Sequence, residues 1–295
     1  MHIQYTEIPT LYYRHMSPPH LRKHGYAELH CISSFSFLRG ASHPEELVKQ
    51  ASLLGYQAIA ITDECSMAGI VKAHVAAKKC GIQLIVGAEF QFREPIHLVL
   101  FAPNRIGYGQ ICNLITIGRR RADKGEYDVQ LKDLTYGMDQ CLAMWLPKGD
   151  QDDFRYGEQL KKVLGNRLWL GVEIFPDGNE IKHYERAFRL SEALKIDLVA
   201  AGDVHMHHPD RKALLDVLSA VRMGQSVRLA GKLLFANREK HLRSPSVISK
   251  LYPETILAET LHIAELCDFS LDELRYEYPE EIVPPHLTPT AYLRQ

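Results

Sequence analysis

Residues 26–63 read YAELHCISSFSFLRGASHPEELVKQASLLGYQAIAITD, and this stretch sets the fold class. An apolar run typical of a strand (26–33) precedes a helical segment that contains a capping-box pattern, Ser42 with Glu45, and that stops at Gly55. A second apolar run, 58–63, follows at once. Strand, helix and strand in immediate succession predict a βα-repeat, the building unit of α/β folds.

The same alternation continues along the chain. Further apolar runs occupy 83–90, 97–102, 141–147, 168–175 and 197–203, and helical patterns occupy 68–80, 106–120, 151–165, 179–195 and 209–223. The runs are continuously apolar, which is typical of parallel strands covered on both faces. Seven strands fit either a barrel or a doubly wound sheet. We favour the barrel because polar residues follow many strands rather than gathering at one switch point.

Composition narrows the class of protein. Of the 295 residues, 46% are hydrophobic and 24% charged, and the net charge of −1 gives no global basic field that would recruit nucleic acid or an anionic membrane. The six cysteines form no CxxC pair, a spacing typical of a reducing compartment. No signal sequence or transmembrane run is recognisable, so we expect a cytoplasmic protein without membrane contact.

Ligand-type side chains gather where the predicted strands end. The C-terminal ends of parallel barrel strands share one mouth, so these residues become neighbours: His30, Asp63, Glu64, Glu89, Asp203 and His205. Mixed nitrogen and oxygen donors suit Zn²⁺, Mn²⁺ or Fe²⁺, and a cluster of such ions can activate water against a phosphoester.

Structural interpretations stand beside the metal hypothesis. His30 alone is more often a hydrogen-bonded core residue than a ligand, Asp63 is equally suited to cap the following helix, and Glu89 can simply pair with an arginine. The remaining candidates fit surface or structural positions better than a site: His74, His207, His208 and the basic segment GRRRADKG at 118–125.

Five segments, YAELHCISSFSFLRGASHPEELV, AIAITDECSMAGIVKAH, LIVGAEF, AAGDVH and CDFSLDELRYEYPEE, resemble the N-terminal PHP (polymerase and histidinol phosphatase) domain of bacterial C-family DNA polymerases. Within that family they are most similar to the error-prone, damage-induced (ImuC-type) branch of polymerase III alpha-like enzymes. The resemblance covers roughly residues 25–295 and implies a distorted, TIM-like (β/α)7 barrel over 26–225. It also implies an N-terminal polar tail over 1–25, and barrel-closing helices with a connector toward an absent polymerase palm domain over 226–295.

The resemblance also implies a metal site in which some ligands are missing. His30, Glu89, His97, Asp203 and His205 stand at positions where metal-binding members carry ligands. Ile32, by contrast, replaces a histidine, Arg39 replaces an aspartate and Glu64 replaces a histidine, while the loop near Tyr127 and Asp128 offers no histidine. Arg39 would bring a permanent positive charge to a cation site, or would instead pair with Glu64, Glu89 or Asp203 and replace the metal.

Three functions follow as hypotheses. The first is a non-catalytic PHP scaffold with no catalytic residues of its own, within an error-prone polymerase of damage-induced (SOS) translesion synthesis. The second is a metal-dependent phosphoesterase or 3′–5′ exonuclease using the reduced site, and the third is a metal-free protein-binding module.

The resemblance implies the cofactors and partners as well. We expect either no metal or one weakly bound Zn²⁺ or Mn²⁺, with Mg²⁺ needed by the absent polymerase domain. The expected partners are the polymerase's own palm and thumb domains, accessory mutagenesis proteins, the sliding clamp, and DNA through the full-length enzyme. The chain stops at AYLRQ with no closing element, as a piece of a longer protein would.

Overall fold

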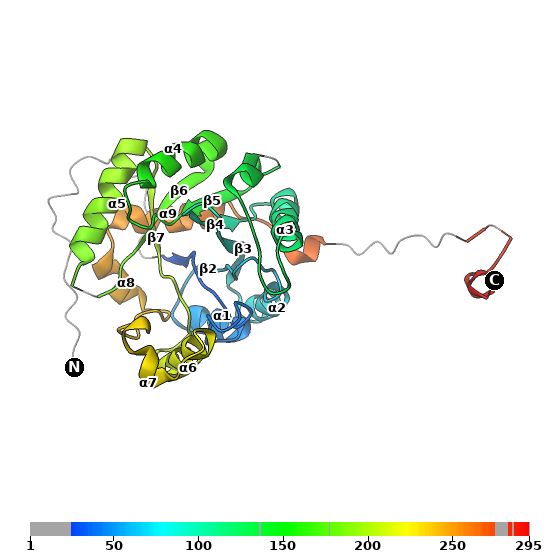
Figure 1. Cartoon of the computed structure of the whole chain (residues 1–295), viewed down its shortest axis with the longest axis horizontal. Helices are drawn as coiled ribbons and strands as arrows, with labels where there is room; N and C mark the ends of the chain where they lie inside the picture. Colours follow the sequence, from blue (N-terminus) through cyan, green and yellow to red (C-terminus); the bar gives the residue numbers. More distant parts are fainter. Residues whose placement is uncertain (1–24, 136, 177, 275–282, 285, 295) are drawn as a thin grey trace.

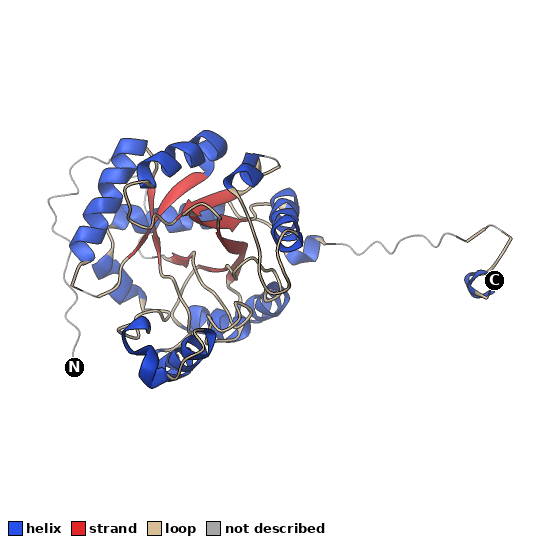
Figure 2. Cartoon of the chain, in the orientation of Figure 1, coloured by secondary structure: helices blue, strands red, loops and turns tan. Residues whose placement is uncertain are grey.

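The computed structural model describes residues 25–294 except 136, 177, 275–282 and 285. Seven strands form one sheet in chain order, with helices around it (Figures 1 and 2). The strands are β1 Ala27–Glu28, β2 Ala58–Ile61, β3 Gln83–Gln91, β4 His97–Phe101, β5 Leu142–Trp145, β6 Leu168–Glu173 and β7 Leu198–Ala201. The predicted α/β barrel is confirmed, whereas the predicted tail at 1–25 lies outside the described residues except for Gly25.

An α-helix lies between successive strands except between β3 and β4, and further helices follow β7 as a C-terminal group. The α-helices are α1 Pro44–Leu53, α2 Ile70–Cys80, α3 Arg105–Arg120, α4 Asp153–Leu164, α5 Glu180–Leu194, α6 Lys212–Arg222, α7 Val227–Ala230, α8 Pro245–Leu251, α9 Glu254–Glu265 and α10 Pro289–Leu293. Short 3-10 turns are η2 Leu131–Thr135, η3 Gly165–Arg167, η4 Pro209–Arg211, η5 Gly231–Leu233 and η6 Leu271–Glu273. Within the described residues no helix is long and apolar enough to cross a membrane.

The first helix begins one residue later than the capping-box prediction. Its N-cap is His43, whose backbone N–H donates to the Glu46 carboxylate at 2.9 Å. The Ser42 hydroxyl instead contacts the ring of His207 at 2.8 Å. The predicted Ser42–Glu45 pair was therefore wrong, because Ser42 is used in a tertiary contact that the local sequence does not reveal.

β4 breaks the predicted parallel pattern. It runs antiparallel to both β3 and β5, while the other neighbouring strands are parallel. Only residues 92–96 separate β3 from β4, whereas a parallel crossover needs a dozen or more residues. The prediction that 97–102 is parallel to its neighbours was therefore wrong. Because β4 is reversed, its first residue, His97, lies at the mouth where β3 ends.

The barrel closes through contacts just beyond β1 and β7. Ile32 N–H donates to Val204 C=O at 2.9 Å, and Val204 N–H donates to His30 C=O at 2.8 Å. Below these bonds, the buried Glu28 carboxylate accepts the N–H groups of His30 and Gly202 at 3.0 and 2.9 Å. Backbone and side-chain bonds thus join the first strand to the last.

Apolar packing fills the barrel and closes the end opposite the C-terminal ends of the parallel strands. The interior holds small and branched side chains such as Ala58, Ala60 and Val199, and α9 contributes Ile263 and Ala264 to the same cluster. The α9 helix contacts β1 and β7. Because apolar groups fill that end, the polar residues collect at the other end of the barrel, where the parallel strands finish.

Candidate functional site

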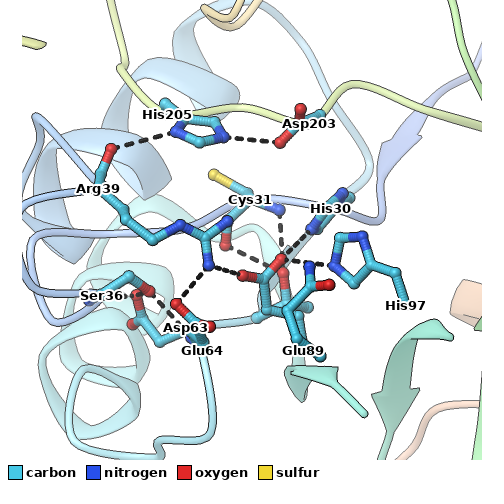
Figure 3. A network of polar contacts seen from close by, with 12 residues as sticks. His30, Cys31, Ser36, Arg39, Asp63, Glu64, Glu89, His97, Asp203 and His205 are labelled. Atoms are coloured by element: carbon cyan, nitrogen blue, oxygen red, sulfur yellow. Dashed lines mark hydrogen bonds and ion pairs between the residues drawn. The ribbon is translucent and has the colours of Figure 1, made fainter. Parts of the chain in front are cut away.

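The barrel mouth brings the predicted site residues together (Figure 3). Its cavity of about 320 Å³ is lined by Arg39, Glu64, Gln91, His97, Glu173, Asp203, His205, Ser219, Arg222, Phe235 and Lys240. His30 and Glu89 lie beneath it and are almost fully buried. One network of hydrogen bonds and ion pairs thus includes His30 and His205, which are 175 positions apart in the chain.

Arg39 lies between two carboxylates. Its Nη1 atom is 2.5 Å from Glu64 Oε2 and also pairs with Glu89 Oε1. Glu89 has no exposed surface. Burial alone would raise the pKa of Glu89, but the Arg39 charge and the bonds from His30 and His97 hold this pKa well below its usual range. Arg39 therefore makes the predicted ion pairs with Glu64 and Glu89, though not with Asp203.

His30 is held by carboxylates on both sides of its ring. Its Nε2 lies 2.7 Å from Glu89 Oε2, and its Nδ1 lies 2.6 Å from Glu173 Oε1. Burial by itself would lower the pKa of His30, but the hydrogen bonds to Glu173 and Glu89 raise it to about 9. A ring that donates from both nitrogens is an imidazolium and has no lone pair left for a metal.

His97 and Tyr127 complete the same cluster. His97 Nε2 lies 3.1 Å from Glu89 Oε2, so Glu89 contacts Arg39 and two histidines. The Tyr127 hydroxyl donates to Glu64 Oε1 at 2.9 Å. The loop around Tyr127 thus supplies a phenol hydroxyl that hydrogen-bonds Glu64.

A second ion-pair group forms after β7. Asp203 Oδ1 lies 2.7 Å from His205 Nε2, and its other oxygen pairs with Lys240 Nζ. His205 Nδ1 lies 3.1 Å from the backbone carbonyl of Arg39. Asp203 adopts a left-handed backbone conformation, φ 43°, which is uncommon for a residue other than glycine. The contacts with His205 and Lys240 hold it there.

Asp63 has a structural role in the loop before α1. Its carboxylate accepts the backbone N–H and hydroxyl of Ser33 at 2.8 and 2.7 Å, and those of Ser36 at 3.1 and 2.7 Å. The following helix begins at Ile70 behind Gly69, so the predicted helix-capping role of Asp63 was wrong. Asp63 instead folds the loop that carries Arg39 to the mouth.

Two residues of the mouth, Glu173 and Lys240, were not predicted from the sequence. Glu173 ends β6, and the same rule of reading strand ends would have found it. Lys240 lies in the basic loop 238–244, where no local pattern marks it as a site residue. Burial lowers the pKa of Lys240 to about 8, although the Glu173 charge opposes this.

The other singled-out residues make contacts outside the mouth. His74 and His208 contact Asp272 and Asp210 at 3.2 Å each. In the basic segment, Arg119 donates to the Cys65 carbonyl at 3.2 Å. These contacts agree with the structural interpretations of both histidines and give Arg119 a tertiary role.

Among the residues that the structure describes, two groups of three side chains lie close enough together to hold a metal ion. They are His30, Glu89 and His97, and His30, Glu173 and Asp203. Both groups depend on His30. The contacts of His30 with Glu89 and Glu173 therefore compete with metal binding in both groups.

Comparison with known proteins fits this architecture. Residues 28–165 match the family model of the PHP domain. The chain contains a match to the PHP domain over these residues. It is 49% identical over 271 residues to the error-prone DNA polymerase of Methylococcus capsulatus, covering 92% of this chain and 26% of that protein. It is 46% identical over 274 residues to the error-prone DNA polymerase of Pseudomonas aeruginosa, covering 93% of this chain and 26% of that protein.

The predicted resemblance to the PHP region of error-prone polymerases is thus confirmed, and this PHP chain spans about a quarter of the length of those relatives. Among solved structures, an amidohydrolase from Chromobacterium violaceum aligns with a TM-score of 0.45 and 13% identity, over 61% of this chain and 88% of that chain.

Proposed function

We propose that this PHP chain serves an error-prone DNA polymerase as a non-catalytic scaffold, with the barrel mouth closed by ion pairs in place of metals. The identity to polymerases along almost the whole chain supports the first part. The closure of the mouth by ion pairs rests on the position of Arg39. Its guanidinium forms ion pairs with Glu89 and Glu64 at the same time.

The charges around the mouth support a metal-free state. Four acidic side chains, Glu64, Glu89, Glu173 and Asp203, are each paired with one or more of three basic ones, His30, Arg39 and Lys240. A divalent cation added to this set would be repelled by Arg39 at short range, and such repulsion amounts to several kcal/mol where water is scarce. Each of the four acids already has a basic side chain as its partner without an ion.

The available donors do not fit the metal that the family implies. Both ring nitrogens of His30 face carboxylates, and both oxygens of Glu89 have protein partners. Ile32, which replaces a histidine of the metal-binding pattern, is 1% exposed and belongs to the apolar core.

Metal content tests this proposal. The purified chain would be incubated with Zn²⁺ and Mn²⁺, thoroughly desalted and submitted to elemental analysis, beside Glu89→Gln and His205→Ala variants that report binding at the mouth. We expect the wild-type chain to retain no metal at the mouth. Its metal content should therefore equal that of both variants. Two or three equivalents that both variants lose would overturn the scaffold proposal, and about one equivalent would indicate a single residual site.

The second candidate function is a metal-dependent phosphoesterase or 3′–5′ exonuclease. The two ligand groups of three around His30 favour it. Its test is Mn²⁺-dependent hydrolysis of bis-p-nitrophenyl phosphate and of a 3′-labelled oligonucleotide, with His205→Ala as the inactive control. Activity that this substitution abolishes would place the exonuclease ahead of the scaffold.

The wider role follows from the same proposal. The remainder of the polymerase would supply Mg²⁺-dependent nucleotide addition across damaged template in the cytoplasm, and would contact the clamp and accessory mutagenesis proteins. The PHP barrel would support the palm and thumb, and the segment after η6 would connect to them. Loss of assembly on deleting the barrel from the whole enzyme would support this arrangement.

A further inference from the structure

The outer face of α6 carries an apolar row with no described element packed over it. Leu214, Val217 and Val221 recur at helical spacing and are 40%, 47% and 56% exposed. The opposite face holds the helix in place, because Leu215 is fully buried in a small cluster with Ala41 and Met206. α6 thus uses one face for folding and leaves the other uncovered.

The apolar row continues onto the next two elements. α6 contacts α7, and α7 contacts η5, and the three elements lie together at the lower edge of the molecule in Figure 1. On them Val227, Leu229 and Leu233 are 41%, 76% and 67% exposed. We name these six residues, Leu214, Val217, Val221, Val227, Leu229 and Leu233, the α6–η5 surface. Several large aliphatic side chains exposed together indicate an interaction site rather than chance exposure.

The charges around the α6–η5 surface are of one sign. Arg222, Arg228, Lys232 and Arg238 are exposed, and none forms a side-chain ion pair with another described residue. The only acid between residues 213 and 238 is Asp216, and Lys212 pairs with it at 2.5 Å. The surface therefore combines apolar side chains with uncompensated positive charge.

We propose that the α6–η5 surface binds an acidic amphipathic helix of a protein partner. The apolar stripe of such a helix would cover the exposed leucines and valines, and its carboxylates would face the four free cations. Nucleic acid suits the surface less well, because phosphates gain nothing from exposed aliphatic groups, and stacking on bases needs exposed aromatic rings. The aromatic ring nearest in sequence, Phe235, instead packs against His205 with ring centroids 5.3 Å apart.

The position of α6 connects this surface with the barrel mouth. Arg222 and Ser219 of α6 line the mouth cavity, while Val221 belongs to the α6–η5 surface. A helix bound there would lie beside the mouth without entering the ion-pair network. Binding at the α6–η5 surface requires neither a metal in the mouth nor the proposed scaffold role.

The test uses the whole chain and a defined probe. The probe is a fluorescent peptide of about 18 residues, about five helical turns, with leucine at i, i+3, i+4 and i+7 and glutamate at most other positions. Fluorescence anisotropy would measure its affinity beside three comparison ligands: the same leucine pattern with lysine, polyglutamate, and a single-stranded oligonucleotide. We expect saturable binding of the acidic amphipathic peptide alone.

Two paired variants separate the contributions. Leu229→Ser with Leu233→Ser removes exposed apolar groups, and Arg228→Glu with Lys232→Glu reverses the charge. Each pair should weaken peptide binding about tenfold or more. Leu53→Ser and Lys79→Glu, on exposed positions of α1 and α2, are matched controls that should leave the affinity unchanged.

Each alternative occupant has a distinct outcome. Equal binding of polyglutamate, preferential binding of the oligonucleotide, or no saturable binding would overturn the proposal. So would a dimer in sedimentation analysis that Leu229→Ser with Leu233→Ser dissociates, because it would assign the surface to a second copy of the chain. Unchanged affinity in both paired variants would place the peptide elsewhere and would also overturn the proposal.

Discussion

Replacing Arg39 tests whether an ion-pair network holds the barrel mouth. Arg39→Met keeps the aliphatic stem but removes the guanidinium partner of Glu89, which is fully buried. Removing one partner of a buried ion pair typically costs about 3–5 kcal/mol. Arg39 is 16% and Glu64 25% exposed, so water can rehydrate part of the site. We therefore expect about 3 kcal/mol of destabilisation, or about 6–12 °C in melting temperature.

The assay is thermal unfolding followed by circular dichroism. Arg93→Met is the matched control, because Arg93 is 63% exposed and also pairs with an aspartate, Asp128. Exposed pairs contribute about 0–1 kcal/mol. Equal melting temperatures for Arg39→Met and Arg93→Met would refute the network.

Arg39→Asp extends the same test to metal binding. This substitution adds a carboxylate to a site that already holds Glu64 and Glu89, so the apo protein should be at least as unstable as Arg39→Met. If the acids then accept Mn²⁺, an ion concentration of about 100 times Kd would restore about 2.7 kcal/mol. The wild-type chain should not respond to Mn²⁺, and an equal gain in both proteins would contradict the metal-replacing role of Arg39.

Three further predictions concern other parts of the network. Because the folded pKa of His30 is raised to about 9, its stabilisation is complete below its unfolded pKa of about 6.5 and is lost as pH rises toward 9. The difference in unfolding free energy between wild type and His30→Gln should shrink over that window, and a constant difference in urea titrations would contradict this. Gly202→Ala places a Cβ 2.2 Å from Glu28 Oε2 at the barrel seam, whereas Gly109→Ala meets nothing within 4 Å. The first variant should lose about 3 kcal/mol or more and the second should gain up to about 1 kcal/mol, as measured by chemical denaturation; similar values for the two would disprove the tight seam. Asp63→Asn replaces an acceptor of four hydrogen bonds by a group that also donates, so about 2 kcal/mol should be lost, and an unchanged denaturation midpoint would show that the loop folds without it.

The repeated strand and helix pattern and the grouping of the strand-end residues could be predicted from the sequence. Apolar periodicity records which side chains of a segment are buried, and that property is local. The rule that parallel strands end at one mouth then brought His30, Glu64, Glu89 and Asp203 together without coordinates. The same reasoning had no means of choosing the direction of 97–102, because an apolar run looks alike in parallel and antiparallel strands.

The partners within the mouth depend on contacts between distant segments. Arg39 was expected to pair with Glu64, Glu89 or Asp203, and it contacts the first two because Asp203 is already paired with Lys240. Nothing near Lys240 in the sequence marks it for the mouth. It reaches Asp203 because residues after η5 form a bridge beside Met206.

Local apolar periodicity in the sequence was therefore enough to predict the α/β barrel. The motifs at the strand ends carried the resemblance to the PHP domain, and that resemblance implies the replacements at Ile32 and Arg39. The tertiary structure alone decided that β4 is reversed and that the ring of His30 lies between the carboxylates of Glu89 and Glu173. The physical reason is that the charge state and partner of a buried group depend on which distant carboxylates surround it, and only the closed barrel sets those distances.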